Sequence, residues 1–221
     1  AKDATETYKV SEPKSLGIGR PALVAAIVGP VQSVAGWLIA GAFWPGFDHF
    51  GSTISDLAAL DSPVWPLMSA FFLLGATLTI VAGVYARSFA LPGRIVLVLA
   101  GIATYGLTVF QSPAQDEGST MHRIFAGISF ILMSAWPMFA IRWRGKAPWP
   151  LKPIGGILAT VAFAAMSIWF LLVWLDPMFT AEGLAERLMV TAQAWYLSLA
   201  ILVVWRFERH NLQAGVPPGK R

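Results

Sequence analysis

The sequence contains no cysteine and few charged residues. Without cysteine, a disulfide framework, a cysteine-ligated zinc site and thiol catalysis are all excluded. Charged residues make up 13% of the 221-residue chain, about half of the roughly 25% that is typical of soluble domains. Hydrophobic residues reach 56% and the mean hydropathy is +0.62, which is more apolar surface than a soluble core of this size can bury. The composition therefore predicts a membrane protein.

Six apolar runs are long enough to cross a bilayer, which takes about 20 mostly apolar residues per helix. They cover residues 21–43, 64–85, 93–110, 122–141, 154–175 and 184–205. None of them contains a lysine, which disfavours a retinal-type Schiff base. A cleaved signal peptide would have its basic end at the terminus and a shorter apolar stretch, so we interpret the first run as a retained helix. The predicted fold is all-α: a polytopic integral membrane bundle of six transmembrane helices.

Lysine and arginine are divided unequally between the two sides of this bundle. Fourteen of the sixteen lie in the two tails and in the second-to-third and fourth-to-fifth connections, and only Arg123 and Arg187 lie on the other side. The positive-inside rule therefore predicts that both termini are cytoplasmic. We expect a cytoplasmic tail at 1–20, a six-helix transmembrane domain at 21–206 and a cytoplasmic tail at 207–221, in the inner (plasma) membrane. The pI of 9.6 reflects basic loops that face anionic lipid, and we expect no nucleic-acid partner.

The first outer loop, between the first two apolar runs, is rich in polar side chains. Its candidate ligand-binding residues are Asp48, His49 and Ser55, and its candidate catalytic residue is Asp56. These residues also have a structural interpretation. Pro-Gly forms a turn with Asp48 and His49 at its exit, and Thr53 or Ser52 caps a short helix that has Asp56 in its first turn. No Gly-x-Ser-x-Gly elbow surrounds Ser55, which favours a plain hydroxyl over a nucleophile.

The second outer loop contributes the remaining candidates. His122 begins the fourth helix and has candidate carboxylate partners in both loops, so it is the second candidate catalytic residue. The candidate ligand-binding residues here are Gln111, Asp116 and Arg123. Arg123 either neutralises the acidic side chains or holds a lipid phosphate. A hydrogen-bonded structural histidine and a solvated turn at Asp116 are the competing interpretations.

The beginning of the sixth helix carries Glu186 beside Arg187. These neighbours either lie at the surface or line a site, and the sequence leaves both interpretations open. Gln32 and Gln193 lie within apolar runs, where buried amides usually hydrogen-bond between helices.

Three motifs in order resemble a six-helix membrane family called domain of unknown function 998. They are Pro45-Gly46-Phe47-Asp48, the Ser-Thr-Ile-Ser-Asp-Leu segment from Ser52 to Leu57, and Phe110, Pro113, Asp116 and His122 in the second outer loop. The resemblance implies the six-helix fold and places Asp56 and His122 at characteristic positions. In the family, an acidic residue closely follows a Phe-Pro element. In this sequence Gln111 and Ser112 lie between Phe110 and Pro113, and the acidic residue Asp116 is displaced. The family implies no established activity.

Two classes of function stay open. In the first, the protein is not an enzyme and an outward-facing polar vestibule binds a membrane lipid or another membrane protein. In the second, it is an intramembrane enzyme acting on a lipid-like substrate, with His122 as general acid/base and Asp56 orienting it, or with both as metal ligands. No HExxH or similar spacing is present, so we predict no metal site and leave any cofactor open. A transporter is disfavoured because the sequence has no evident internal repeat and no acidic residue at mid-membrane.

Overall fold

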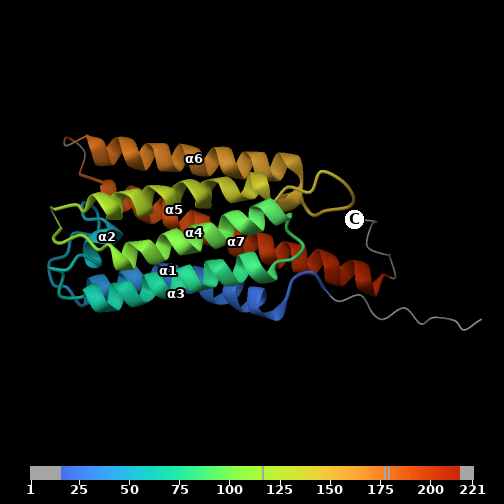
Figure 1. Ribbon diagram of the computed structural model, residues 1–221, viewed down its shortest axis with the longest axis horizontal. Helices are drawn as coiled ribbons and strands as arrows, with labels where there is room; N and C mark the ends of the chain where they lie inside the picture. The colour runs from blue at the N-terminus through green and yellow to red at the C-terminus, as the bar shows by residue number, and fades with distance from the viewer. Residues whose placement is uncertain (1–15, 116, 177, 179, 215–221) are drawn as a thin grey trace, which may run out of the picture.

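The structure of the protein is a computed structural model that describes residues 16–115, 117–176, 178 and 180–214. All regular elements in these residues are helical (Figure 1). They are α1 (Arg20–Ala42), α2 (Ile54–Leu57), α3 (Trp65–Tyr85), α4 (Leu91–Val109), α5 (Thr120–Phe139), the 3-10 turn η1 (Trp149–Leu151), α6 (Pro153–Leu175) and α7 (Glu182–Gln213). The predicted all-α class is therefore confirmed.

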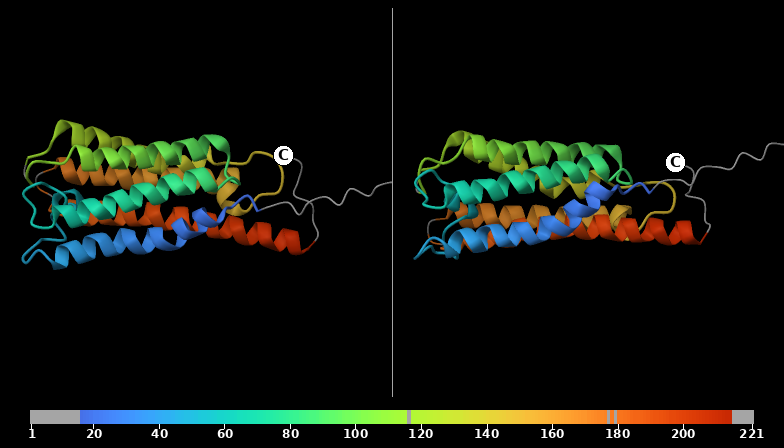
Figure 2. Two further views of the ribbon diagram at one scale, coloured as in Figure 1. Left: turned by 60° about the horizontal axis from the view of Figure 1, so that its bottom comes forward. Right: turned by 90° about the horizontal axis from the view of Figure 1, so that it is seen from below.

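The six long helices form a closed ring. α1 packs against α3, α3 against α4, α4 against α5, α5 against α6, α6 against α7, and α7 returns to α1. Their axes run along the long dimension of the molecule (Figures 1 and 2). The short α2 lies at one end of the ring and contacts α1 and α7. We call this the α2 end and the opposite end, where the described chain begins and α7 finishes, the terminal end.

Each predicted apolar run coincides with one long helix. The helix ends differ from the predicted ones by at most two residues, except that α7 continues eight residues past 205 to Gln213. Hydropathy marks the part of a helix that can lie in hydrocarbon, and it does not mark where the backbone hydrogen bonding stops. Within the described residues, five helices are long and apolar enough to cross a membrane, namely α1, α3, α4, α6 and α7. The less apolar α5, which begins with His122 and Arg123 in its first turn, is not among them, so its span stays a prediction.

The outer surface of the ring is apolar and its interior uses small residues. Val31, Ile131 and Ile154 are 65%, 66% and 68% exposed, a pattern suited to lipid rather than to water. Between α3 and α4, a Cβ added to Gly101 would lie 2.8 Å from the carbonyl oxygen of Ala76. Small residues of this kind let helix backbones approach closely where lipid supplies no hydrophobic driving force.

One carboxylate joins three segments at the terminal end. Glu208 of α7 accepts hydrogen bonds from the backbone N–H of Gly17 (3.1 Å) and of Ile18 (3.3 Å) and from the hydroxyl of Ser88. Ile18 also pairs with Ala86 in an isolated antiparallel bridge. The segment before α1, the α3–α4 connection and α7 are therefore tied together at this end.

Candidate vestibule at the α2 end

The loop that follows α1 is shaped by its own turn residues. Gly46 has a φ of 82°, the left-handed region that favours glycine. Beside it, the Asp48 carboxylate accepts the N–H of Phe50 at 2.9 Å and the Asp48 carbonyl accepts the N–H of Ser52 at 2.9 Å. The N–H groups of Phe50 and Gly51 hold the pKa of Asp48 below its ordinary value, because they stabilise the ionised form. Asp48 is exposed and serves as a turn residue.

A reciprocal capping box begins α2. The N–H of Thr53 donates to the Asp56 carboxylate at 2.6 Å, and the N–H of Asp56 donates to the Thr53 hydroxyl at 3.2 Å. This arrangement satisfies two N–H groups that a helix start leaves without intrahelical partners. The interpretation of Thr53 as a cap is confirmed, and Asp56 is held in a defined position by its own helix.

α7 supports this loop through two buried, ionisable neighbours. Glu186 and Arg187 are each only 4% exposed. The Glu186 carboxylate accepts the N–H of Ile54 at the start of α2. Arg187 donates from Nη1 to the Ser52 carbonyl at 2.8 Å, and its guanidinium lies 5.3 Å from the ring centre of Trp37. The residues that the sequence left open between surface and site are therefore buried supports of the loop.

His49 lies among aromatic side chains. Its ring meets Phe47 edge-on with centroids 5.1 Å apart, and meets Trp37 in the same manner at 6.1 Å. Burial lowers the pKa of the imidazole and the Arg187 guanidinium lowers it further, while Asp48 acts in the opposite direction. His49 therefore packs on α1, where Gly41 leaves room for its ring.

The loop after α4 contacts the loop after α1. The N–H of Leu60 donates to the Ser112 carbonyl at 2.9 Å. The Gln111 amide donates to the Ser69 hydroxyl at 2.6 Å and to the Ala58 carbonyl at 3.3 Å, so it joins the end of α4 to α3 and α2. Asp116 lies outside the described residues.

His122 occupies the first turn of α5 and is 6% exposed. Its N–H donates to the Ser119 hydroxyl at 3.3 Å, and its ring Nδ1 lies 3.0 Å from the carbonyl oxygen of Phe110. A carbonyl can only accept, so Nδ1 carries the proton and Nε2 keeps its lone pair. Nε2 is buried and has no hydrogen-bond partner among the described residues. His122 therefore has both a structural contact and a second ring nitrogen left for other chemistry.

A cavity of about 460 Å³, which we call the vestibule, lies at the α2 end beside α5 and α6. Of the predicted site residues, its wall contains Ser55, Asp56, His122 and Arg123. Glu186 joins them from α7. Asp48, His49 and Gln111 do not line the vestibule, because their side chains are used in the loop contacts described above.

The vestibule wall has a polar part and an apolar part. The polar part is contributed by the two loops and the first turns of α5 and α7, and its ionisable side chains are Asp56, Arg123 and Glu186. The apolar part is contributed by Ala126, Phe130 and Ile131 of α5 and by Ile168, Leu171 and Trp174 of α6. The Arg123 guanidinium lies 5.5 Å from the ring centre of Trp174, so the cation stands where the two parts meet.

The described residues contain no group of three or more His, Cys, Asp or Glu side chains that could hold a metal ion. The vestibule does combine a neutral imidazole, carboxylates and a guanidinium in one concave wall. Such a wall can bind a polar group, and a ring nitrogen with a lone pair can accept a proton.

The fold and its apolar surface define the class of the protein as an integral membrane protein with several membrane-spanning helices. Residues 27–203 match the model of the family described as protein of unknown function DUF998, and the chain belongs to that family. The resemblance seen in the loop motifs is thereby confirmed. Comparison with curated proteins found no match, and neither did comparison with solved structures.

Proposed function

We propose that the protein binds a membrane phospholipid, with the headgroup in the polar part of the vestibule and one tail along its apolar part. The observation that carries this proposal is the single concave wall in which Arg123, His122 and Asp56 adjoin the apolar side chains of α5 and α6. A lipid has the same division between a charged end and a hydrocarbon end. The concave shape favours a small molecule over a membrane protein, which would need a broader and flatter face.

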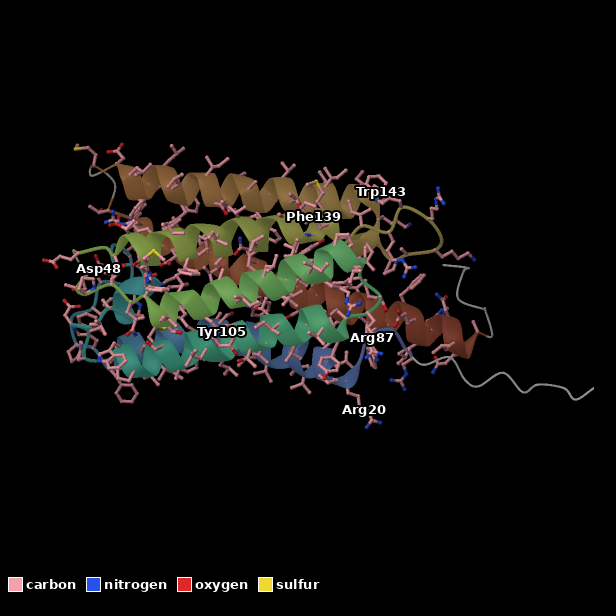
Figure 3. The ribbon with its side chains drawn as sticks, in the orientation of Figure 1. Arg20, Asp48, Arg87, Tyr105, Phe139 and Trp143 are labelled. Atoms are coloured by element: carbon pink, nitrogen blue, oxygen red, sulfur yellow. The ribbon has the colours of Figure 1, made fainter. Side chains whose placement is uncertain are left out.

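The orientation of the protein follows from its charges. The α2 end carries Arg123 and Arg187, and the remaining basic residues belong to the terminal end and the tails. Figure 3 places Asp48 at one end of the ring and Arg20 and Arg87 toward the other. With six spanning helices and the positive-inside rule, both termini are cytoplasmic, and the vestibule opens to the outer side of the inner (plasma) membrane.

Arg123 is the group that binds the headgroup phosphate. A guanidinium matches the geometry of a phosphate with two parallel hydrogen bonds. Arg123 is exposed and lies over the Trp174 ring, whereas Arg187 is buried and already holds the Ser52 carbonyl. Of the two arginines at this end, Arg123 is therefore the one positioned for a ligand.

Lipid retention tests this function. Native mass spectrometry of the purified protein, incubated with dipalmitoyl phosphatidylglycerol in detergent, counts the bound lipids. We expect one lipid to survive detergent removal in the wild type and to be lost in Arg123→Gln and in Gly127→Leu. Gly127 lines the vestibule, and a Cβ added there meets nothing within 4 Å, so a larger side chain fills the space without a clash.

Two control variants carry matched changes away from the vestibule. Arg144→Gln removes an exposed guanidinium at the terminal end, and Ile128→Phe adds bulk on the exposed face of α5. Both should retain the lipid. Equal retention by all five proteins would contradict the vestibule as the binding site.

An intramembrane enzyme is the second candidate, favoured by the Nε2 of His122. This nitrogen keeps a lone pair and has no partner in the described part of the chain, while Asp56 lines the same vestibule. A lipid-like substrate in the vestibule would place its polar bonds near a general base. Lipid products after incubation with dipalmitoyl phosphatidylglycerol, absent for His122→Asn, would support this candidate over simple binding.

A further inference from the structure

A second cavity of about 150 Å³ lies inside the helix ring, and we call it the interior cavity. It is lined from Met68 to Ala82 on α3 and from Glu186 to Ile201 on α7. With a rise of 1.5 Å per residue, either stretch is about 20 Å long. The hydrocarbon core of a bilayer is about 30 Å thick, so one leaflet provides about 15 Å. The interior cavity is therefore narrow, and it reaches as deep as a lipid tail does.

The interior cavity begins where the vestibule ends. Ser55, Phe130 and Glu186 line both cavities. One wall therefore has the vestibule on one side and the ring interior on the other. Phe130 is the large apolar side chain of this wall, and it comes from α5.

The interior cavity is mainly apolar in character. Three hydroxyl groups in its wall donate to the backbone of their own helices: Ser33 to Pro30 at 2.9 Å, Thr79 to Gly75 at 2.9 Å and Thr104 to Ala100 at 3.0 Å. Because these hydroxyl hydrogens already have acceptors, the hydroxyls do not require ordered water as a hydrogen-bond partner. The remaining wall includes Met68 and Met133, whose flexible thioether side chains adapt to the shape of an apolar occupant.

We propose that one hydrocarbon chain of the lipid bound in the vestibule passes the Phe130 wall and enters the interior cavity. This inference rests on the proposed function and specifies its ligand as a two-chain lipid. One chain lies inside the ring and the other lies along α5 and α6. A cavity of about 150 Å³ lined by apolar side chains holds one benzene ring, so the interior cavity accepts a chain segment of about six carbons without rearrangement. Longer segments require movement of the methionines.

Photolabelling tests this arrangement. The probe is a phosphatidylcholine with a diazirine at the end of one acyl chain, reconstituted with the protein in vesicles. Ala82 and Ile201 line the interior cavity and are each 0% exposed, so the surrounding bilayer cannot label them. We expect mass spectrometry to find the label on the α3 and α7 peptides at these residues.

Two glycine variants locate the chain. Gly29 lines the interior cavity, and a Cβ added there comes no closer than 3.9 Å to the Ser198 hydroxyl, so Gly29→Leu fills the cavity from inside. It should reduce labelling of the Ala82 and Ile201 peptides at least tenfold and leave one lipid bound in native mass spectrometry. Gly127→Leu, which fills the vestibule, should reduce both the interior labelling and the lipid retention.

The outcomes separate the two proposals. Interior peptides that stay unlabelled, while Gly127→Leu still loses the bound lipid in native mass spectrometry, would overturn the interior chain and leave the vestibule function intact. The same holds if Gly29→Leu leaves interior labelling unchanged. Lipid retention that Gly127→Leu does not reduce would overturn the proposed function itself. Melting temperatures of both variants within a few degrees of the wild type establish that the ring has folded.

Discussion

The Glu186 carboxylate accepts the backbone N–H of Ile54, a residue 132 positions away in the sequence. This contact joins the start of α7 to the start of α2 in a buried environment. The adjacent Arg187 donates a hydrogen bond to the Ser52 carbonyl in the same loop. The loop that carries Asp56 into the vestibule is therefore held by the last helix of the ring and not by its own chain neighbours alone.

Removing the Glu186 carboxylate should destabilise the protein. Glu186→Ala leaves the N–H of Ile54 buried and without an acceptor, which costs about 1–3 kcal/mol, whereas Glu186→Gln keeps a carbonyl acceptor and should cost less. Chemical or thermal unfolding in detergent measures the difference. Glu117→Ala, an exposed carboxylate at the same end, is the control and should unfold like the wild type. Equal stability of Glu186→Ala and Glu117→Ala would show that the buried contact contributes nothing to the free energy of unfolding.

Replacing Arg187 should loosen the loop after α1. Lysine at this position keeps the charge but loses the planar group that lies over Trp37 and near Phe47. Because a desolvated cation–π contact contributes roughly 1–2 kcal/mol, amide hydrogen exchange of loop residues 44–52 should accelerate about tenfold. Exchange in α4 serves as the internal control and should not change. An unchanged rate in the loop would mean that Arg187 does not hold it.

Protonation of His49 should make the protein less stable in mild acid. Burial puts the pKa of His49 in the folded protein below its ordinary value of 6.5. As the pH falls through about 6.5, the unfolded chain therefore takes up a proton that the folded protein resists, and stability decreases. His49 faces Asp48 and Arg187, and these two groups act on its charge in opposite directions.

Melting temperatures at pH 7.5 and pH 5.5 measure this effect. His49→Asn cannot titrate, so its loss of stability between the two pH values should be smaller than that of the wild type. Asp48→Asn is the matched control, because the lowered pKa of Asp48 places its titration below this range and the wild-type difference should persist. A His49→Asn variant with the full wild-type difference would refute the role of His49.

His122 variants distinguish a structural role from a chemical one. His122→Ala removes the donor to the Phe110 carbonyl and should lower stability by about 1 kcal/mol, while His122→Asn can replace this hydrogen bond and should fold normally. A chelator should leave the melting temperature of the wild type unchanged, since Asp56 and His122 form no three-ligand metal group within the described residues. A chelator effect that reproduces the mutant would instead identify a metal.

The absence of cysteine makes the topology directly testable. Glu117→Cys at the α2 end and Lys146→Cys at the terminal end each introduce the only thiol in the chain. In intact cells, a membrane-impermeant maleimide should label Glu117→Cys and should reach Lys146→Cys only after the membrane is opened. The opposite pattern would invert the predicted orientation of the vestibule.

Local features of the structure follow from the sequence. An apolar run of about 20 residues is a continuous segment, so the positions of all six long helices could be predicted to within two residues at eleven of their twelve ends. The Thr53–Asp56 capping box and the turn at Asp48 involve residues two or three positions apart, and both could be anticipated. Such contacts depend only on short-range geometry.

The composition of the vestibule was decided by tertiary structure. The sequence placed the candidate residues of both loops on one side of the membrane, but it did not show that Gln111 would bind Ser69 and Ala58 or that His49 would pack against Phe47. The sequence left open that Glu186 lines a site, but it did not show that its carboxylate accepts the N–H of Ile54. The sequence gives one sign of this role. Glu186 is followed directly by Arg187, near the start of a helix and on the side of the membrane that has few other basic residues.

The physical reason is the separation of these partners along the chain. Asp56 and His122 line one cavity because α2 lies, and α5 begins, at the same end of a closed ring. Glu186 joins them because α7 closes that ring against α1. A run of apolar residues determines that a helix forms and how long it is. Which neighbours the helix meets, and which side chains are then left to face a cavity, depends on how all six helices pack together.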